Sequence, residues 1–223
     1  MNLPPVPDLP ELELLINVFE LLSLPIVYCL FIGYIFGSIP SGLWIVKSWY
    51  NIDIREYGSH NIGATNVFRT VGISAALVVL ISDMAKGMAA CCIANWIYHM
   101  NFLTVIAAIG TIIGHNYSLF LGLKGGKGVA TGLGLLVYLM PEVSLIGFGV
   151  WLVIVLLTKY VSFGSIVAAS LVPILAWAFG YSRSFIALAI VCGLFIIIRH
   201  KENIIRLVNG TENKIKVGNV KKL

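Results

Sequence analysis

One polar segment of this sequence carries the residue types that hold phosphate groups in proteins. It reads Asp53-Ile-Arg-Glu-Tyr-Gly-Ser-His-Asn-Ile-Gly-Ala-Thr-Asn-Val-Phe-Arg69. Arg55 can present a planar fork to a phosphate, and glycines in the segment let the backbone wrap closely around an anion. Neutral side chains that can add hydrogen bonds without further charge follow at Ser59, Asn61, Thr65 and Asn66. The segment predicts an anion-binding loop, and an ordinary membrane-surface loop rich in turn residues is the alternative.

Lysine and glycine are combined in a second segment, Gly122-Leu-Lys-Gly-Gly-Lys-Gly-Val-Ala-Thr131. Lys124 and Lys127 flank Gly125 and Gly126, directly before an apolar run. Backbone N–H groups of glycines can approach a phosphate, and a following helix directs the positive end of its dipole at it. Lys127 is followed by glycine instead of Ser or Thr, so the segment is not a P-loop and does not predict nucleotide hydrolysis. It predicts phosphate binding, with a basic membrane anchor as the alternative.

Two further groups of polar residues interrupt apolar runs. In Gly37-Ser-Ile-Pro-Ser-Gly42, Pro40 removes a backbone donor and can open a helix, which would let Ser38 face a site. A simple proline kink explains the same residues. Asp83 and Lys86 stand three residues apart, on one face of a helix. Ionisable residues within membrane segments are functional candidates, but this pair can also be a structural ion pair.

Histidine and cysteine show no metal-ligand spacing. The histidines are His60, His99, His115 and His200, and the cysteines are Cys29, Cys91, Cys92 and Cys192, all four within apolar runs. No HExxH, CxxC or mixed cluster connects them. We therefore expect no structural metal, no disulfide and no cofactor. The sequence also lacks GxSxG, which argues against a serine-hydrolase nucleophile.

The elements that must position these residues are apolar. Of 223 residues, 59% are hydrophobic and 11% charged, whereas soluble domains have about 45–50% apolar and about 25% charged residues. Apolar windows lie near 22–46, 73–98, 102–122, 128–140, 143–158, 163–180 and 185–198. We expect an all-α integral membrane protein of about seven transmembrane helices. The window 128–140 reaches only about 20 Å, so it is also a candidate half-span.

Charge predicts the orientation of the chain. Residues 1–20 contain Asp8, Glu11, Glu13 and Glu20 without Lys or Arg, which is unlike a signal peptide. With seven crossings, most basic residues fall on the side of the C-terminus, which places the N-terminus outside and the C-terminus in the cytoplasm. A single crossing over 128–158 would reverse the C-terminus and fits the rule less well. We expect an acidic lead-in over 1–20, a membrane domain over 21–198 and a basic cytoplasmic tail over 199–223 that contributes to the site.

Three segments together resemble one enzyme family, the bacterial acyl-phosphate:glycerol-3-phosphate acyltransferases. They are Gly58–Arg69, Gly122–Thr131 and Arg199-His-Lys-Glu-Asn-Ile-Ile-Arg-Leu-Val-Asn-Gly-Thr-Glu-Asn-Lys214. The resemblance covers roughly residues 25–216 in order and spacing. Ser118 departs from the family pattern, where Pro is expected, and Lys159 stands where the family usually has Arg.

The resemblance implies transfer of a fatty acyl group from acyl-phosphate to the 1-hydroxyl of glycerol 3-phosphate, giving lysophosphatidic acid and phosphate. It implies catalytic roles for Ser38, Asn66, Lys127 and His200, and substrate-binding roles for Arg55, Ser59, Asn61, Thr65, Lys124, Gly125, Gly126, Ser162 and Asn203. The expected partners are the two substrates and membrane lipids, not nucleic acid, and the enzyme that supplies acyl-phosphate is a candidate. The expected location is the bacterial inner membrane, with the active site facing the cytoplasm.

Two other classes of protein remain as alternatives at this point. An organophosphate or phosphate transporter could use the same loops as gates, although the sequence lacks the inverted repeat that many transporters display. A purely structural membrane protein is hard to reconcile with so many glycine-supported donors on one side. The proton of the attacking hydroxyl can pass to substrate phosphate, to His200 or to water, and the sequence leaves these routes open.

Overall fold

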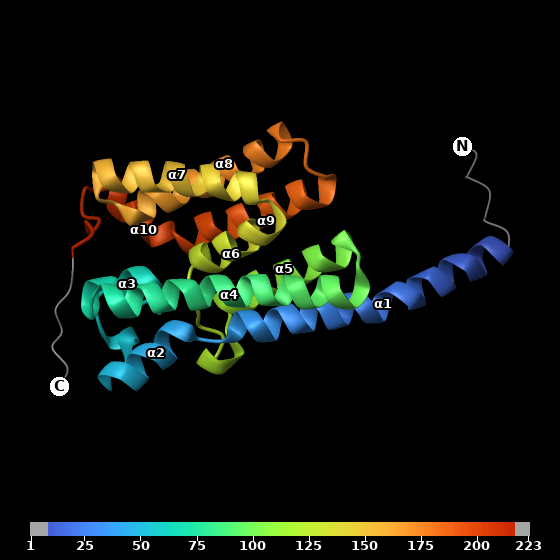
Figure 1. The fold of residues 1–223 in the computed structure, drawn as a ribbon, viewed down its shortest axis with the longest axis horizontal. Coiled ribbons are helices and arrows are strands. Elements are labelled where there is room, and N and C mark those ends of the chain that lie inside the picture. The colour runs from blue at the N-terminus through green and yellow to red at the C-terminus, as the bar shows by residue number, and fades with distance from the viewer. Residues whose placement is uncertain (1–8, 217–223) are drawn as a thin grey trace.

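Helices make up all the regular structure in the part of the chain described by the computed structural model, residues 9–216 (Figure 1). In chain order they are α1 (Leu9–Ser38), α2 (Ser41–Tyr50), η1 (Ile54–Glu56), α3 (Ala64–Thr70), α4 (Ile73–Tyr98), α5 (Asn101–Asn116), η2 (Leu119–Leu121), α6 (Val129–Leu139), α7 (Pro141–Thr158), α8 (Val161–Ala178), α9 (Arg183–Arg199) and α10 (Lys201–Val208). The expected all-α architecture is therefore present.

Five segments are long and apolar enough to cross a membrane. They are Ser23–Tyr50, Ile73–Tyr98, Asn101–Leu121, Pro141–Thr158 and Val161–Ala178, and the pair α9 and α10, bent by 58°, is a sixth candidate. The expected window 128–140 forms α6, which has 11 residues. At 1.5 Å per residue it reaches only about 17 Å, less than the hydrocarbon core of about 30 Å. Seven crossings and the orientation of the termini therefore stay predictions.

The boundaries of the expected domains differ from those of the helices. α1 begins at Leu9, so the second half of the expected acidic lead-in continues directly into the first span. Residues 1–8 of that lead-in and residues 217–223 of the expected tail lie outside the described residues.

Two groups of helices are joined by the short α6 (Figure 1). In one group α1 runs along α5, with α4 beside both, and in the other α8 packs between α7 and α9. The contact of α1 with α5 needs glycine, because a Cβ added to Gly33 would lie 2.0 Å from the carbonyl oxygen of Ala107. Such close approach is how small residues associate helices in membranes, where lipid offers no hydrophobic driving force between them.

The first span is interrupted at Pro40, the residue that indicated a break in the sequence. α1 ends at Ser38 and α2 begins at Ser41, with Pro40 at its N-terminal boundary. The Lys86 ammonium donates a hydrogen bond of 2.8 Å to the carbonyl oxygen of Ile39, within this break. The same ammonium lies 2.8 Å from Asp83 Oδ1, and both side chains are buried. The pair predicted on one face of α4 thus supports irregular backbone at membrane depth.

Candidate active site

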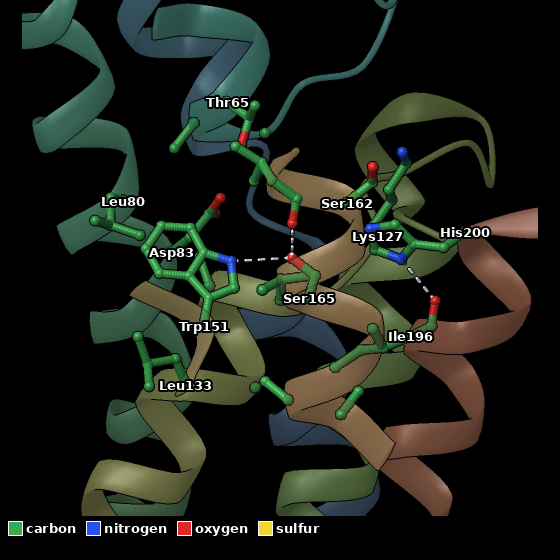
Figure 2. Close-up of a pocket in the computed structure, with 18 of the residues that line it drawn as sticks. Thr65, Leu80, Asp83, Lys127, Leu133, Trp151, Ser162, Ser165, Ile196 and His200 are labelled. Atoms are coloured by element: carbon green, nitrogen blue, oxygen red, sulfur yellow. Dashed lines mark hydrogen bonds between the residues drawn. The ribbon is translucent and has the colours of Figure 1, made fainter. Parts of the chain in front are cut away.

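A cavity of about 410 Å³ extends between the two helix groups. Its lining comes from the loop before α3, from the glycine-rich loop at Lys127, from helices α3 to α10, and from the segment after α10. Figure 2 shows Lys127, Ser162 and His200 together in this cavity, with Leu133 farther along it. Polar side chains gather where α8 begins and α9 ends, and the remaining lining is mostly apolar. Such a cavity can hold a ligand with a polar head and an apolar tail.

Eight of the residues predicted from the sequence line this cavity although they are distant in the chain. They are Ser59, Asn61, Thr65, Asn66, Lys127, Ser162, His200 and Asn203. Five others are not among its lining residues: Ser38, Arg55, Lys124, Gly125 and Gly126. The structure thus separates the predicted set into groups that face the cavity and groups beside it.

Asn66 organises the first predicted loop. Its amide nitrogen donates to the carbonyl oxygens of Ile54, Tyr57 and Asn61 at 3.2, 3.0 and 2.8 Å, and its amide oxygen accepts from the Ser59 N–H at 2.8 Å. The side chain is buried. Because the whole amide is occupied by backbone partners, this geometry favours a role in shaping the loop over direct contact with a substrate.

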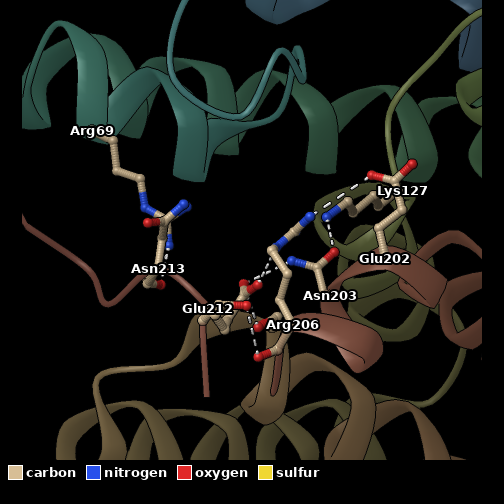
Figure 3. A network of polar contacts seen from close by, with 9 residues as sticks. Arg69, Lys127, Glu202, Asn203, Arg206, Glu212 and Asn213 are labelled. Carbon is tan, nitrogen blue, oxygen red and sulfur yellow. Dashed lines mark hydrogen bonds and ion pairs between the residues drawn. The ribbon is translucent and has the colours of Figure 1, made fainter. Parts of the chain in front are cut away.

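Lys127 belongs to a polar network that joins the second loop to the tail (Figure 3). Its ammonium donates to Asn203 Oδ1, and the Asn203 amide donates to Glu212 Oε1 at 2.7 Å. Ser162 Oγ donates to the same oxygen at 2.8 Å, and Arg206 Nε donates to Glu212 Oε2 at 2.7 Å. Burial is the largest influence on Lys127 and lowers its pKa to about 8. A half-buried ammonium of this kind gains from an anionic ligand that restores its lost solvation.

The glycine-rich loop is fixed from two sides. Arg199 donates from Nε to the carbonyl oxygen of Gly126 at 3.1 Å and from Nη2 to that of Gly125 at 3.0 Å. The Gly126 N–H donates to the carbonyl oxygen of His115 at 3.0 Å. A Cβ at Gly126 would lie 2.2 Å from His115 Nε2, so only glycine fits against this ring. The loop therefore reaches the cavity as a rigid element that presents Lys127.

Three of the predicted residues that do not line the cavity come from three different segments. Arg55 forms a bidentate ion pair with Asp53, with an Nη2 to Oδ2 distance of 2.6 Å. Ser38 is fully buried, and its hydroxyl accepts from the Leu119 N–H at 3.3 Å. Lys124 is exposed on the surface of the second loop. Their roles in binding or catalysis stay predictions.

Four ionisable residues that line the cavity are outside the predicted site set: Arg69, Asp83, His115 and Glu212, of which the sequence singled out only Asp83 as a candidate. Arg69 donates from Nη2 to the carbonyl oxygen of Asn213 at 2.8 Å, and its buried Nε has no hydrogen-bond partner in the described structure. The available signal for Glu212 was that it is the only acidic residue after Glu202. Burial opposes its ionisation, but hydrogen bonds from Arg206, Asn203 and Ser162 hold its pKa below the ordinary value.

The fold and the cavity define a class: a helical integral membrane protein with one cavity whose lining is polar at one end and mostly apolar elsewhere. A family model described as glycerol-3-phosphate acyltransferase matches residues 27–210. The chain belongs to this family and is an acyltransferase.

Similar proteins cover most of this chain. Glycerol-3-phosphate acyltransferase of Synechococcus sp. (strain JA-3-3Ab) is 46% identical over 183 residues, which are 82% of this chain and 90% of the relative. The Fusobacterium nucleatum protein of that name is 44% identical over 184 residues, 82% of this chain and 94% of the relative. A crystal structure of PlsY (YgiH), an integral membrane glycerol 3-phosphate acyltransferase, in its glycerol 3-phosphate form superposes with a TM-score of 0.81 at 38% identity, covering 86% of this chain and 96% of that one. Its lysophosphatidic acid form gives 0.79 at 37% identity, covering 85% and 94%.

Proposed function

We propose that this protein transfers a fatty acyl group from acyl-phosphate to the 1-hydroxyl of glycerol 3-phosphate. The products are lysophosphatidic acid and inorganic phosphate, so the reaction is the first acylation step of phospholipid biosynthesis. It takes place at the inner membrane of a bacterium, with the active site facing the cytoplasm. The observation that carries the proposal is one cavity in which the hydrogen-bond donors around Lys127 are continuous with an apolar region. Relatives named glycerol-3-phosphate acyltransferase support glycerol 3-phosphate as the acyl acceptor.

The reaction needs positioning more than a covalent nucleophile. The 1-hydroxyl oxygen of glycerol 3-phosphate attacks the acyl carbonyl carbon, the bond from that carbon to the phosphate oxygen breaks, and inorganic phosphate leaves. Two phosphate groups must approach each other, so cations that screen their repulsion lower the barrier. Lys127 and Arg69 line the cavity and can supply this screening, and Ser162 and Asn203 can add hydrogen bonds.

His200 is suited to accept the proton of the attacking hydroxyl. Its Nδ1 lies 2.8 Å from the carbonyl oxygen of Ile196, which can only accept a hydrogen bond. Nδ1 therefore carries the proton in the neutral ring, and Nε2 keeps its lone pair. An oxygen of the leaving phosphate is the other acceptor compatible with this site.

Purified protein in detergent tests the proposal directly. We expect phosphate release and lysophosphatidic acid formation from glycerol 3-phosphate with acyl-phosphate, and none with acyl-CoA. Lys127→Ala is expected to lower kcat/KM by about a hundredfold or more, as loss of a charged phosphate contact does. Val153→Ala, at an exposed position of α7 outside the cavity, is the control. Absence of product from either donor with folded protein would contradict the proposal and favour anion transport.

A further inference from the structure

The cavity opens to the outside at two places of opposite polarity. Among its described lining residues, only Ser59, Ile73, Leu77 and Phe148 are exposed, and all the others are buried or half-buried. Ser59 lies in the polar loop before α3. The other three are apolar, with exposed fractions of 57% for Ile73, 48% for Leu77 and 41% for Phe148. They come from α4 and α7, which both qualify as membrane spans.

The apolar opening exists because α6 is short. A Cβ at Gly134 of α6 would lie 2.1 Å from the carbonyl oxygen of Met84, so the two helices touch at this level of α4. Likewise a Cβ at Gly87 would lie 2.7 Å from the carbonyl oxygen of Thr131, near the first turn of α6. The preceding turns of α4, from Ile73 to Leu80, extend beyond the N-terminus of α6, and α7 is not among the helices that pack extensively on α4. The side of the cavity between these turns and α7 is therefore uncovered.

An ordered aromatic pair forms the α7 side of this opening. The rings of Phe148 and Trp151 stack at 5.5 Å between centroids, with 21° between their planes. Trp151 Nε1 donates to Ser165 Oγ at 3.3 Å, and Ser165 Oγ donates in turn to the carbonyl oxygen of Val161 at 2.9 Å. Figure 2 shows the Trp151 ring turned toward Ser165, with Leu80 on the opposite side of the ring. The polar edge of the indole is thus satisfied within the protein, and its apolar face remains for an apolar ligand.

We propose that the opening between α4 and α7 is a lateral portal through which the acyl chain of the donor enters from the bilayer core. This inference rests on the proposed function, which supplies a substrate with a fatty chain. An acyl chain that entered through the loop at Ser59 would have to expose its methylenes to water, whereas the portal keeps them in an apolar environment throughout. Glycerol 3-phosphate, which is small and charged, enters on the side of Ser59.

Narrowing the portal distinguishes the two routes. In Leu77→Trp an indole ring, which is larger than the leucine side chain, occupies the α4 side of the opening. The readout is the ratio of kcat/KM for hexadecanoyl-phosphate to that for hexanoyl-phosphate, because the short donor is soluble and can use the aqueous opening. We expect this ratio to fall about tenfold or more, since steric exclusion acts on the long chain while the phosphate site is unchanged. Ile81→Trp, one helical turn along α4, 63% exposed and outside the cavity, is the matched control and should keep the wild-type ratio.

The outcomes separate this inference from the proposed function. An unchanged ratio in Leu77→Trp would overturn the portal, whether kcat/KM falls equally for both donors or stays at the wild-type value. The acyltransferase activity of the wild-type protein would remain in place. If Leu77→Trp does not fold, Ile73→Trp narrows the same opening from 57% exposed Ile73 and gives the same readout. Wild-type protein that turns over neither donor would instead overturn the proposed function, and with it the occupant assigned to the portal.

Discussion

The surroundings of Lys127 in the site change the pKa of its ammonium group. Its ammonium is half-buried and bonded to Asn203, and burial lowers its pKa to about 8. A lysine is charged below its pKa, so the form that attracts phosphate predominates at neutral pH and is lost as the pH rises through about 8. Since kcat/KM reports the ionisation of the free enzyme, its alkaline limb should lie in this range.

Lys127→Arg tests this assignment. The guanidinium stays charged to above about pH 12, so the alkaline limb should move upward by more than one unit even if the maximal rate falls. The measurement is kcat/KM for glycerol 3-phosphate from about pH 6 to about pH 10. Lys201→Arg, at an exposed position of α10, should keep the wild-type profile. An alkaline limb at the same pH in Lys127→Arg would show that another group causes it.

At the scale of elements, the buried pair on α4 stabilises the broken first span. Asp83 and Lys86 are 2% and 4% exposed, and Lys86 also bonds the Ile39 carbonyl oxygen at 2.8 Å. Removing one partner of a buried pair leaves an uncompensated charge, which costs about 3–5 kcal/mol, whereas replacing both partners removes that penalty. Asp83→Asn should therefore lower the thermal midpoint in detergent more than the double variant Asp83→Asn/Lys86→Met does. A double variant less stable than the single one would contradict a charge-pairing role.

At the scale of the whole molecule, the segment after α10 connects both helix groups. Glu212 accepts from Ser162 on α8 and from Arg206 on α10, while the neighbouring Asn213 carbonyl accepts from Arg69 on α3. The Ile215 N–H donates to the carbonyl oxygen of Lys159 at 2.8 Å, between α7 and α8. The tail thus crosses the polar end of the cavity and holds the groups around Lys127 together.

Glu212→Gln should weaken this connection. The variant loses charge-assisted hydrogen bonds at a side chain that is 3% exposed, a loss of about 2 kcal/mol in the free energy of unfolding. Because folding lowers the pKa of Glu212, the stabilisation that this carboxylate contributes is complete above its unfolded pKa of about 4.3. The stabilisation disappears as the pH falls through the lower pKa of the folded state. Glu202→Gln removes the 88% exposed carboxylate 3.8 Å from Arg206 and should change little. Equal effects of the two substitutions, measured by unfolding in detergent at neutral pH, would contradict the central role of Glu212.

Much of the fold could be predicted because the bilayer imposes simple rules on a sequence. Spans must be apolar and about 20 residues long, and irregular backbone needs cover, so the run of 73–98 and the break at Pro40 were readable from composition. The count of crossings was not, because α6 is too short for these rules and its level is set by packing: Gly134 lies against Met84.

The sequence by itself predicted which residue types would bind phosphate, and it identified the family through three ordered segments. Only the tertiary structure decided which of them face one cavity. The catalytic role expected of Asn66 stays a prediction, and the structure shows that its amide is hydrogen-bonded to the backbone of its own loop. Glu212 and Arg69 joined the site through contacts with segments more than forty residues away, at Ser162 and Asn213. Motif spacing reports local chemistry, whereas hydrogen-bond partners and cavity walls come from distant segments that only folding brings together.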